Sequence, residues 1–190
     1  RVIPDRIAAA TYLAAGAATG STLTVSDIIP KHLEPIVPVL EESGCVLKTN
    51  GNKMTIIPPK RLHRVKSIRT MPYPGFPTDA QAPIMAMLSV ADGTSVFVEN
   101  IFESRYKHVG ELLRLGANIK VEGRVAIVDG VEKLSGASVE ATDLRGGAAL
   151  VVAGLTAYGT TEISGLNHLD RGYENLERNL RNLGADVKRI

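Results

Sequence analysis

The feature that most constrains the fold of this 190-residue chain is a unit that occurs three times. Each unit opens with an aspartate that precedes an apolar segment of helical character, and a glycine follows that segment. At the same distance beyond each glycine lies a histidine or an arginine. In chain order these positions are Asp5, Gly20 and His32, then Asp79, Gly93 and Arg105, then Asp143, Gly159 and Arg171. Such repetition indicates a fold built from one supersecondary unit used three times.

The order of predicted elements is the same in each unit. A strand-like run rich in Thr, Val and Ile follows the glycine, and a second helix with regularly spaced leucines comes next. Further extended runs complete the unit, and a short extended run precedes each opening aspartate. The unit is therefore β-α-β-α-β-β, with repeats at about residues 1–62, 63–136 and 137–190. We expect a single α/β domain over residues 1–190 with pseudo-threefold symmetry.

The opening helices carry almost no charge beyond their first turn, as in the stretch IMAMLSVA of the second unit. A helix that is apolar all round is buried. We therefore expect the opening helices at the centre and the sheets outside, an inside-out α/β plan. The third unit stops after the predicted strand DVKRI, without a hairpin partner, and little precedes the predicted strand VIP of the first unit. We expect a fragment of a longer protein, with unpaired sheet edges.

Composition disfavours several classes of function. The net charge is +2 and aromatic residues make up 4% with no Trp, so neither a basic face nor stacking platforms favour nucleic acid as a partner. The single cysteine, Cys45, excludes an internal disulfide framework, and we expect a buried structural thiol there. The four histidines lack metal-binding spacing, so no metal site is predicted. Because no uncharged apolar run is long enough to cross a membrane, we expect a cytoplasmic protein without a membrane partner.

The second opening helix is approached through the stretch PYPGFPTDAQAP, whose leading prolines fix their own φ angles. Thr78 and Gln81 have the spacing of a capping box, which predicts Thr78 as the N-cap and Asp79 in the first turn. An aspartate in a first turn is common because it stabilises the helix dipole. The alternative is that the stiff approach holds Asp79 in place for a function. The sequence leaves both interpretations open.

Three arginines lie close to predicted helix starts. Arg105 and Arg171 occupy equivalent places between a strand and a helix, and Arg145 is in the first turn of the third opening helix. The planar guanidinium group donates parallel hydrogen bonds to phosphate or carboxylate, and helix N-termini attract the same anions. These residues predict a site for an anionic ligand on one side of the domain. The alternative is local pairing, of Arg145 with Asp143 and of Arg171 with Asp170.

Four segments together resemble the UDP-N-acetylglucosamine enolpyruvyl transferases: PGFPTDAQAP, ENIFESRY, GVEKLSGASVEATDLRGGAALVVAGL and HLDRGYENLERNLRNLGAD. The resemblance covers essentially all 190 residues. It implies one of two inside-out α/β domains, with the second catalytic domain absent from this chain. It also implies transfer of the enolpyruvyl group from phosphoenolpyruvate to the 3-hydroxyl of UDP-N-acetylglucosamine, with release of phosphate, at the start of bacterial peptidoglycan synthesis. The isolated domain is expected to be inactive.

The resemblance implies roles for individual residues. Asp79 is expected to bind the sugar hydroxyl and deprotonate it, and Arg171 to contact phosphoenolpyruvate. The implied catalytic residues are Asp79, Asp143 and Arg171. The implied substrate-binding residues are Thr78, Asp79, Ile101, Phe102, Arg105, Arg145 and Arg171. The reaction requires no cofactor and no metal ion.

Two alternatives stay open. The sister enzyme that acts on shikimate 3-phosphate has the same fold and reaction type, although the FPTD sequence argues against it. A non-catalytic domain that binds only a nucleotide sugar or a partner protein is the second alternative. A comparison of the binding of the UDP-sugar and of shikimate 3-phosphate tests the first alternative. A second three-unit half with a reactive cysteine in the same protein would exclude the second.

Overall fold

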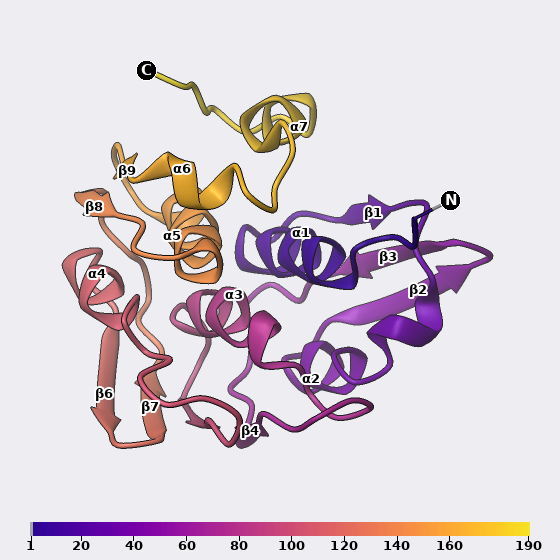
Figure 1. The fold of residues 1–190 in the computed structure, drawn as a ribbon, viewed down its shortest axis with the longest axis horizontal. Coiled ribbons are helices and arrows are strands. Elements are labelled where there is room, and N and C mark those ends of the chain that lie inside the picture. Colours follow the sequence, from indigo (N-terminus) through magenta and orange to yellow (C-terminus); the bar gives the residue numbers. More distant parts are fainter. Residues whose placement is uncertain (1) are drawn as a thin grey trace.

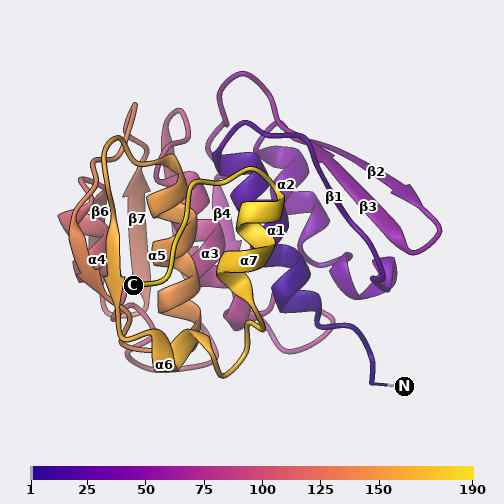
Figure 2. The ribbon, with the colours of Figure 1, turned by 90° about the horizontal axis from the view of Figure 1, so that it is seen from above.

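The structure, a computed structural model, describes residues 2–190. The three opening helices lie side by side at its centre: α1 (Arg6–Ala18), α3 (Thr78–Leu88) and α5 (Leu144–Thr156). Each of them packs against the other two. In Figures 1 and 2 the sheets and the shorter helices lie around this central group. The predicted inside-out α/β fold is confirmed.

The central helices are apolar on all sides because neighbours surround them. In α3, every residue from Ala80 to Leu88 is buried. Burial of one Leu, Ile or Met side chain stabilises the fold by about 1.5–3 kcal/mol. Small residues let the elements approach closely: a side chain at Gly147 in α5 would place its Cβ 3.0 Å from Ala141 and Leu169. These helices therefore form the hydrophobic core that all three repeats share.

Each repeat contributes one outer sheet. The first contains β1 (Leu23–Val25), β2 (Val46–Asn50) and β3 (Lys53–Ile57) in the antiparallel order β1-β3-β2. The second contains β4 (Ser67–Arg69), β5 (Thr94–Val98), β6 (Asn118–Glu122) and β7 (Val125–Asp129) in the order β4-β5-β7-β6. The third pairs β8 (Ser138–Glu140) with β9 (Glu162–Ser164). The strands β4 and β8 run parallel to β5 and β9, which a helical crossover allows.

Two predicted strands are wrong. Residues 2–4, the run VIP, and residues 186–190, the run DVKRI, do not form strands. A strand requires a hydrogen-bonded neighbour, and within residues 2–190 no strand pairs with either segment. The C-terminal segment is held instead by an ion pair in which Arg189 Nη1 lies 3.1 Å from Asp170 Oδ1. The second repeat shows the whole predicted sequence of elements.

Shorter helical segments cover the periphery: η1 (Pro30–Leu33), α2 (Val37–Glu42), α4 (Val109–Arg114), α6 (Leu166–Leu169) and α7 (Leu176–Asn182). Gly44, Gly116 and Gly184 follow α2, α4 and α7 with φ angles of +91°, +89° and +94°. This left-handed conformation favours glycine after a helix, and its recurrence reflects the repeated unit. Cys45 follows the first of these glycines and is buried, as expected.

Candidate functional site

The first turns of the three central helices meet at one face of the molecule. Arg145 in α5 contacts Asp79 in α3, and the charge of Asp5, which precedes α1, also acts on Arg145. Helix starts present free backbone N–H groups and the positive end of the helix dipole. This face is therefore where the fold favours negatively charged groups.

The three opening aspartates do not have the same relation to their helices. Asp5 and Asp143 are N-caps, and each accepts hydrogen bonds from backbone N–H groups of its own first turn, the shortest at 2.7 and 2.8 Å. In α3 the N-cap is Pro77 and the helix begins at Thr78, so the prediction that Thr78 caps this helix is wrong. Asp79 consequently lies inside the first turn, and its carboxylate bonds to side chains from other elements.

Glu99, which directly follows β5, explains why Thr78 is not a cap. Its buried carboxylate accepts hydrogen bonds from the hydroxyls of Thr70 and Thr78, both at 2.8 Å, and from the backbone N–H groups of Ile101 and Phe102, at 2.7 and 3.0 Å. Burial alone would raise the pKa of Glu99, but these four hydrogen bonds outweigh it and the pKa lies below its usual value. Glu99 thus joins the start of α3 to the ends of β4 and β5.

The carboxylate of Asp79 receives a guanidinium group on each oxygen. Arg105 Nη2 lies 2.6 Å from Oδ1, and Arg145 Nη2 lies 3.2 Å from Oδ2. The Asp79 side chain is 41% exposed, against 26% for Arg105 and 13% for Arg145. We call these three residues the Asp79 triad. It carries a net charge of +1 and remains accessible to a ligand on the Asp79 side.

Arg145 is the most buried member of the triad. Its Nη1 donates a hydrogen bond of 3.2 Å to the hydroxyl of Tyr173, and its guanidinium carbon lies 5.7 Å from the centre of the Tyr173 ring. Burial alone would lower the pKa of Arg145, but Tyr173, Asp79 and Asp5 outweigh it, and the pKa is raised. Arg145 therefore stays positively charged.

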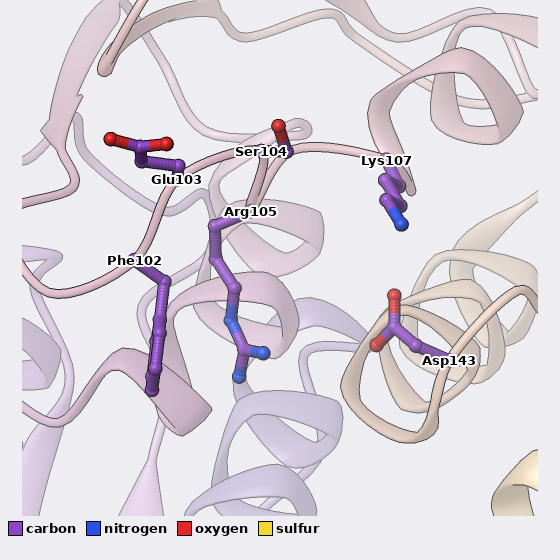
Figure 3. A pocket seen from close by; sticks show the side chains of 6 residues that line it. All are labelled: Phe102, Glu103, Ser104, Arg105, Lys107 and Asp143. Atoms are coloured by element: carbon purple, nitrogen blue, oxygen red, sulfur yellow. The ribbon is translucent and has the colours of Figure 1, made fainter.

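Beside the triad lies a pocket of about 260 Å³. Arg105 lines it, and Figure 3 shows Phe102 next to Arg105, with Lys107 and Asp143 directed toward one another on the other side. The guanidinium carbon of Arg105 lies 5.6 Å from the centre of the Phe102 ring. The lining residues are Phe102, Glu103, Ser104, Arg105, Lys107 and Asp143. An exposed aromatic ring beside two cations suits a ligand with an apolar face and negative charge.

His108 is the buried residue that follows Lys107 of the pocket lining. It is 2% exposed, and burial, with the nearby charge of Arg105, lowers its pKa to about 4 although Asp143 acts in the opposite sense. His108 packs against the first turn of α5, where a side chain at Gly146 would place its Cβ 3.0 Å from the His108 Cβ. The imidazole is therefore neutral at pH 7, and the glycine allows this close contact.

The comparisons with known proteins agree with this fold. The EPSP synthase (3-phosphoshikimate 1-carboxyvinyltransferase) family pattern matches residues 1–180. A UDP-N-acetylglucosamine 1-carboxyvinyltransferase of Desulfofundulus thermocisternus is 54% identical over 188 residues, which make up 99% of this chain and 77% of that protein. The chain belongs to the UDP-N-acetylglucosamine 1-carboxyvinyltransferase family.

The chain spans about half the length of other relatives. The UDP-N-acetylglucosamine 1-carboxyvinyltransferase 2 of Caldanaerobacter subterraneus subsp. tengcongensis is 54% identical over 189 residues, which are 100% of this chain and 45% of that protein. Among solved structures, the enolpyruvyl transferase NikO of Streptomyces tendae matches with a TM-score of 0.87 at 29% identity, over 98% of this chain and 44% of that one. An EPSP synthase of Acinetobacter baumannii, at 19% identity and a TM-score of 0.74, shares the fold.

The structure brings together most, not all, of the predicted site residues. Asp79, Arg105 and Arg145 are in direct contact. Arg171 is exposed. The alternative that it pairs with Asp170 is wrong, because Asp170 pairs with Arg189. Within residues 2–190, the Arg171 side chain forms no hydrogen bond or ion pair. Asp143 bonds to the backbone of its own helix, so the alternative of an ion pair with the Arg145 guanidinium is also wrong.

Sequence reasoning missed two residues of this region, Glu99 and Tyr173. Glu99 directly follows the strand in the segment TSVFVEN. An acidic residue directly after a strand is a signal that could have indicated a functional position. Tyr173 lies in the LDRGYE segment, two residues after Arg171, and no local pattern there marks the tyrosine. In the part of the chain that the structure describes, no three His, Cys, Asp or Glu residues are grouped to hold a metal ion. Nor is any helix there long and apolar enough to cross a membrane.

Proposed function

We propose that this chain is one domain, built of three repeats, of an enzyme that transfers the enolpyruvyl group of phosphoenolpyruvate to the 3-hydroxyl of UDP-N-acetylglucosamine. Relatives at 54% identity carry the name of that activity, which supports the proposal. Their greater length supports a second catalytic domain beyond residues 1–190. The reaction begins peptidoglycan synthesis, and we assign it to the bacterial cytoplasm.

The chemistry is an addition followed by an elimination. The sugar hydroxyl attacks the central carbon of phosphoenolpyruvate while the methylene carbon is protonated, which gives a tetrahedral intermediate that bears phosphate. Loss of phosphate together with a proton from the newly formed methyl group leaves the enolpyruvyl ether. The reaction needs a base, an acid and clustered cations in a site that excludes water. No metal ion or cofactor takes part in this scheme.

The observation that carries the proposal is the position of Asp79 between two arginines, next to the pocket that Arg105 lines. A carboxylate in this place can orient the sugar hydroxyl early and accept its proton late, once carbon–oxygen bond formation has made that proton acidic. Arg105 and Arg145 can balance the phosphate and carboxylate charges of the reactants, because guanidinium groups match planar oxyanions.

The nucleotide sugar is proposed to lie along Thr78 and the loop after β5. Because Glu99 takes the N–H groups of Ile101 and Phe102, these two residues offer their carbonyl oxygens and the half-exposed Phe102 ring. The Thr78 hydroxyl, whose proton goes to Glu99, can accept a hydrogen bond from the ligand.

Asp143 and Arg171 are proposed to act on phosphoenolpyruvate from the other side. Asp143 lines the pocket opposite Phe102, where its carboxylate can orient a polar group of the ligand. Arg171 is exposed, so its guanidinium group is available to the phosphate or carboxylate of the ligand. Water exclusion and the remaining cations are assigned to the second domain, so the chain alone is expected to show no turnover.

Titration calorimetry of the chain with UDP-N-acetylglucosamine and with shikimate 3-phosphate tests the proposal. Binding of the nucleotide sugar alone supports it, and binding of shikimate 3-phosphate alone favours the sister activity. A phosphate-release assay on the protein that includes the second domain separates an enzyme from a non-catalytic binding domain. Absence of phosphate release there, with both substrates bound, would show that the protein is not this enzyme.

A further inference from the structure

A chain of hydrogen bonds leads from α1 to the guanidinium group of Arg145. Tyr173, in the loop between α6 and α7, places its hydroxyl 3.2 Å from Arg145 Nη1 and 2.9 Å from Thr11 Oγ1. Thr11, in α1, places the same Oγ1 2.9 Å from the carbonyl oxygen of Ile7. Tyr173 and Thr11 are each 4% exposed. Water therefore does not replace these contacts freely.

The direction of every hydrogen bond in this chain can be assigned. The carbonyl of Ile7 only accepts and the guanidinium group of Arg145 only donates, whereas each hydroxyl has one proton. Thr11 must therefore give its proton to Ile7, which leaves the Tyr173 hydroxyl as the donor to Thr11. The Tyr173 oxygen is then free to accept from Arg145. One assignment satisfies all three contacts.

The guanidinium group of Arg145 is held at two edges, by Tyr173 and by Asp79. Nη2 bonds to Asp79 and Nη1 bonds to Tyr173, while the Tyr173 ring covers one face. The buried Nε of Arg145 has no hydrogen-bond partner among residues 2–190. The orientation of the group therefore depends on Tyr173 on one side and on Asp79, a residue of the proposed reaction, on the other.

We propose that Tyr173 is a positioning residue that Thr11 orients and that holds Arg145 against Asp79. Its hydroxyl acts only through Arg145. When Asp79 engages a ligand, Tyr173 keeps the guanidinium group in place. The consequence for turnover rests on the proposed function, whereas the positioning itself does not.

The variant Tyr173→Phe removes the hydroxyl and retains the ring that packs with Leu169, Leu176 and Leu180. Tyr12→Phe is the matched control. Tyr12 packs against the same cluster, and its hydroxyl accepts a hydrogen bond of 3.2 Å from Asn179 Nδ2 rather than from Arg145. Thr11→Val and Thr11→Ser form a second pair, because only serine retains the hydroxyl.

The first measurement is the hydrogen-exchange rate of the Arg145 Nη1–H groups, which donate to Tyr173, by nitrogen-15 NMR of the chain without ligand. Loss of a hydrogen bond to a charged group corresponds to an increase in that rate of about tenfold or more. We expect this increase in Tyr173→Phe, a smaller increase in Thr11→Val, and the wild-type rate in Tyr12→Phe and Thr11→Ser. An unchanged rate in Tyr173→Phe, or the same increase in Tyr12→Phe, overturns the proposal. If Tyr173→Phe does not fold, the Thr11 pair decides in the same way.

The second measurement is kinetic, on the protein that includes the second domain. We expect Tyr173→Phe to lower kcat by about tenfold, with KM for UDP-N-acetylglucosamine unchanged and with Tyr12→Phe indistinguishable from wild type. Equal kcat in Tyr173→Phe and wild type overturns the catalytic consequence. If the wild-type protein shows no enolpyruvyl transfer, the proposed function fails, and the exchange rates still decide the role of Tyr173.

Discussion

Asp79 and Arg145 occupy the same position, the second residue, of two different opening helices, and they form an ion pair with 3.2 Å between Oδ2 and Nη2. They are 66 residues apart in the chain. In the repeat register Asp79 corresponds to Asp143, but α3 begins one residue before its aspartate and α5 one residue after, so residues of opposite charge occupy the same helix position.

Replacement of Asp79 by asparagine should affect chemistry more than folding. The variant keeps the size and helix position, so the helix start should lose only a few tenths to about 1 kcal/mol of stabilisation. It removes the proton acceptor, and a general base commonly contributes about 10²–10⁴-fold to the rate. Turnover by the protein that includes the second domain, together with urea unfolding, checks this. Near wild-type turnover with normal binding would leave Asp79 as a helix-start residue only.

The same variant should bind simple anions more tightly. The Asp79 carboxylate occupies one edge of Arg105 and of Arg145, and the neutral amide would leave the two guanidinium groups with a net charge of +2 instead of +1. We expect the affinity of the chain for inorganic phosphate to rise by a few-fold to about tenfold, with strong dependence on salt. Asp170→Asn, which makes the same change of charge beside Arg189, is the control. Equal affinities in all three proteins would contradict a competition between Asp79 and the anion.

Arg171→Lys should not be a conservative change. The charge remains, but the planar two-point contact with an anion is lost. A charge-assisted hydrogen bond is worth about 1.5–3 kcal/mol, so KM for phosphoenolpyruvate should rise by roughly 10- to 100-fold while KM for UDP-N-acetylglucosamine changes little. Arg178→Lys, at an exposed position on α7, provides the comparison. Identical kinetics of the two variants would show that Arg171 does not contact phosphoenolpyruvate.

Glu99→Gln should destabilise the chain by about 1–3 kcal/mol at pH 7, because an amide cannot accept all four hydrogen bonds that the carboxylate accepts. The pKa of Glu99 is lowered in the folded state. Its contribution is therefore complete above the usual glutamate pKa of about 4.3 and is lost as the pH falls below that value toward the folded pKa. Urea unfolding at pH 7 and pH 3 should show a smaller difference between variant and wild type at pH 3. Glu103→Gln, an exposed change, is the control.

His108 should make the chain less stable in mildly acidic solution. Its folded pKa is about 4, below the value of about 6.5 for an unfolded histidine. The unfolded chain therefore binds the proton first, and stability falls as the pH is lowered from about 6.5 to 4, by at most about 3 kcal/mol. His108→Gln should flatten the unfolding free energy over this range, whereas His63→Gln, at an exposed position, should not. If the unfolding free energy of the wild-type chain does not change between pH 6.5 and 4, burial of His108 does not lower its pKa in this way.

The central helices and the repeated order of elements could be predicted because they depend on local patterns. Apolar residues on every side of a helix require burial, and the aspartates and glycines mark the helix ends in all three repeats. The extended runs VIP and DVKRI have strand-like sequences as well. They fail as strands because pairing depends on a neighbour that no local pattern provides.

The site was predicted only in part because its contacts join distant segments. Arg105 and Arg145 were found from their places at helix starts, but their convergence on Asp79 depends on how two repeats pack. The capping box at Thr78 and Gln81 was misleading. Glu99, 21 residues away, takes the Thr78 hydroxyl, and Gln81 is buried within α3. Local propensity could not reveal this competition.

The placement of Pro77 has a consequence for how a symmetric protein acquires a single site. The fold provides three equivalent helix starts, and two of them keep an aspartate that caps its own helix. At the start of α3, Pro77, with its fixed φ angle, leads into the helix without a side-chain cap. Asp79 therefore does not cap its own helix, and its carboxylate is partly exposed. The core that the three helices share keeps this uncapped helix start in place. The difference of one helix start from the other two, rather than an added loop or cofactor, is what leaves the Asp79 carboxylate free to bond side chains of other elements.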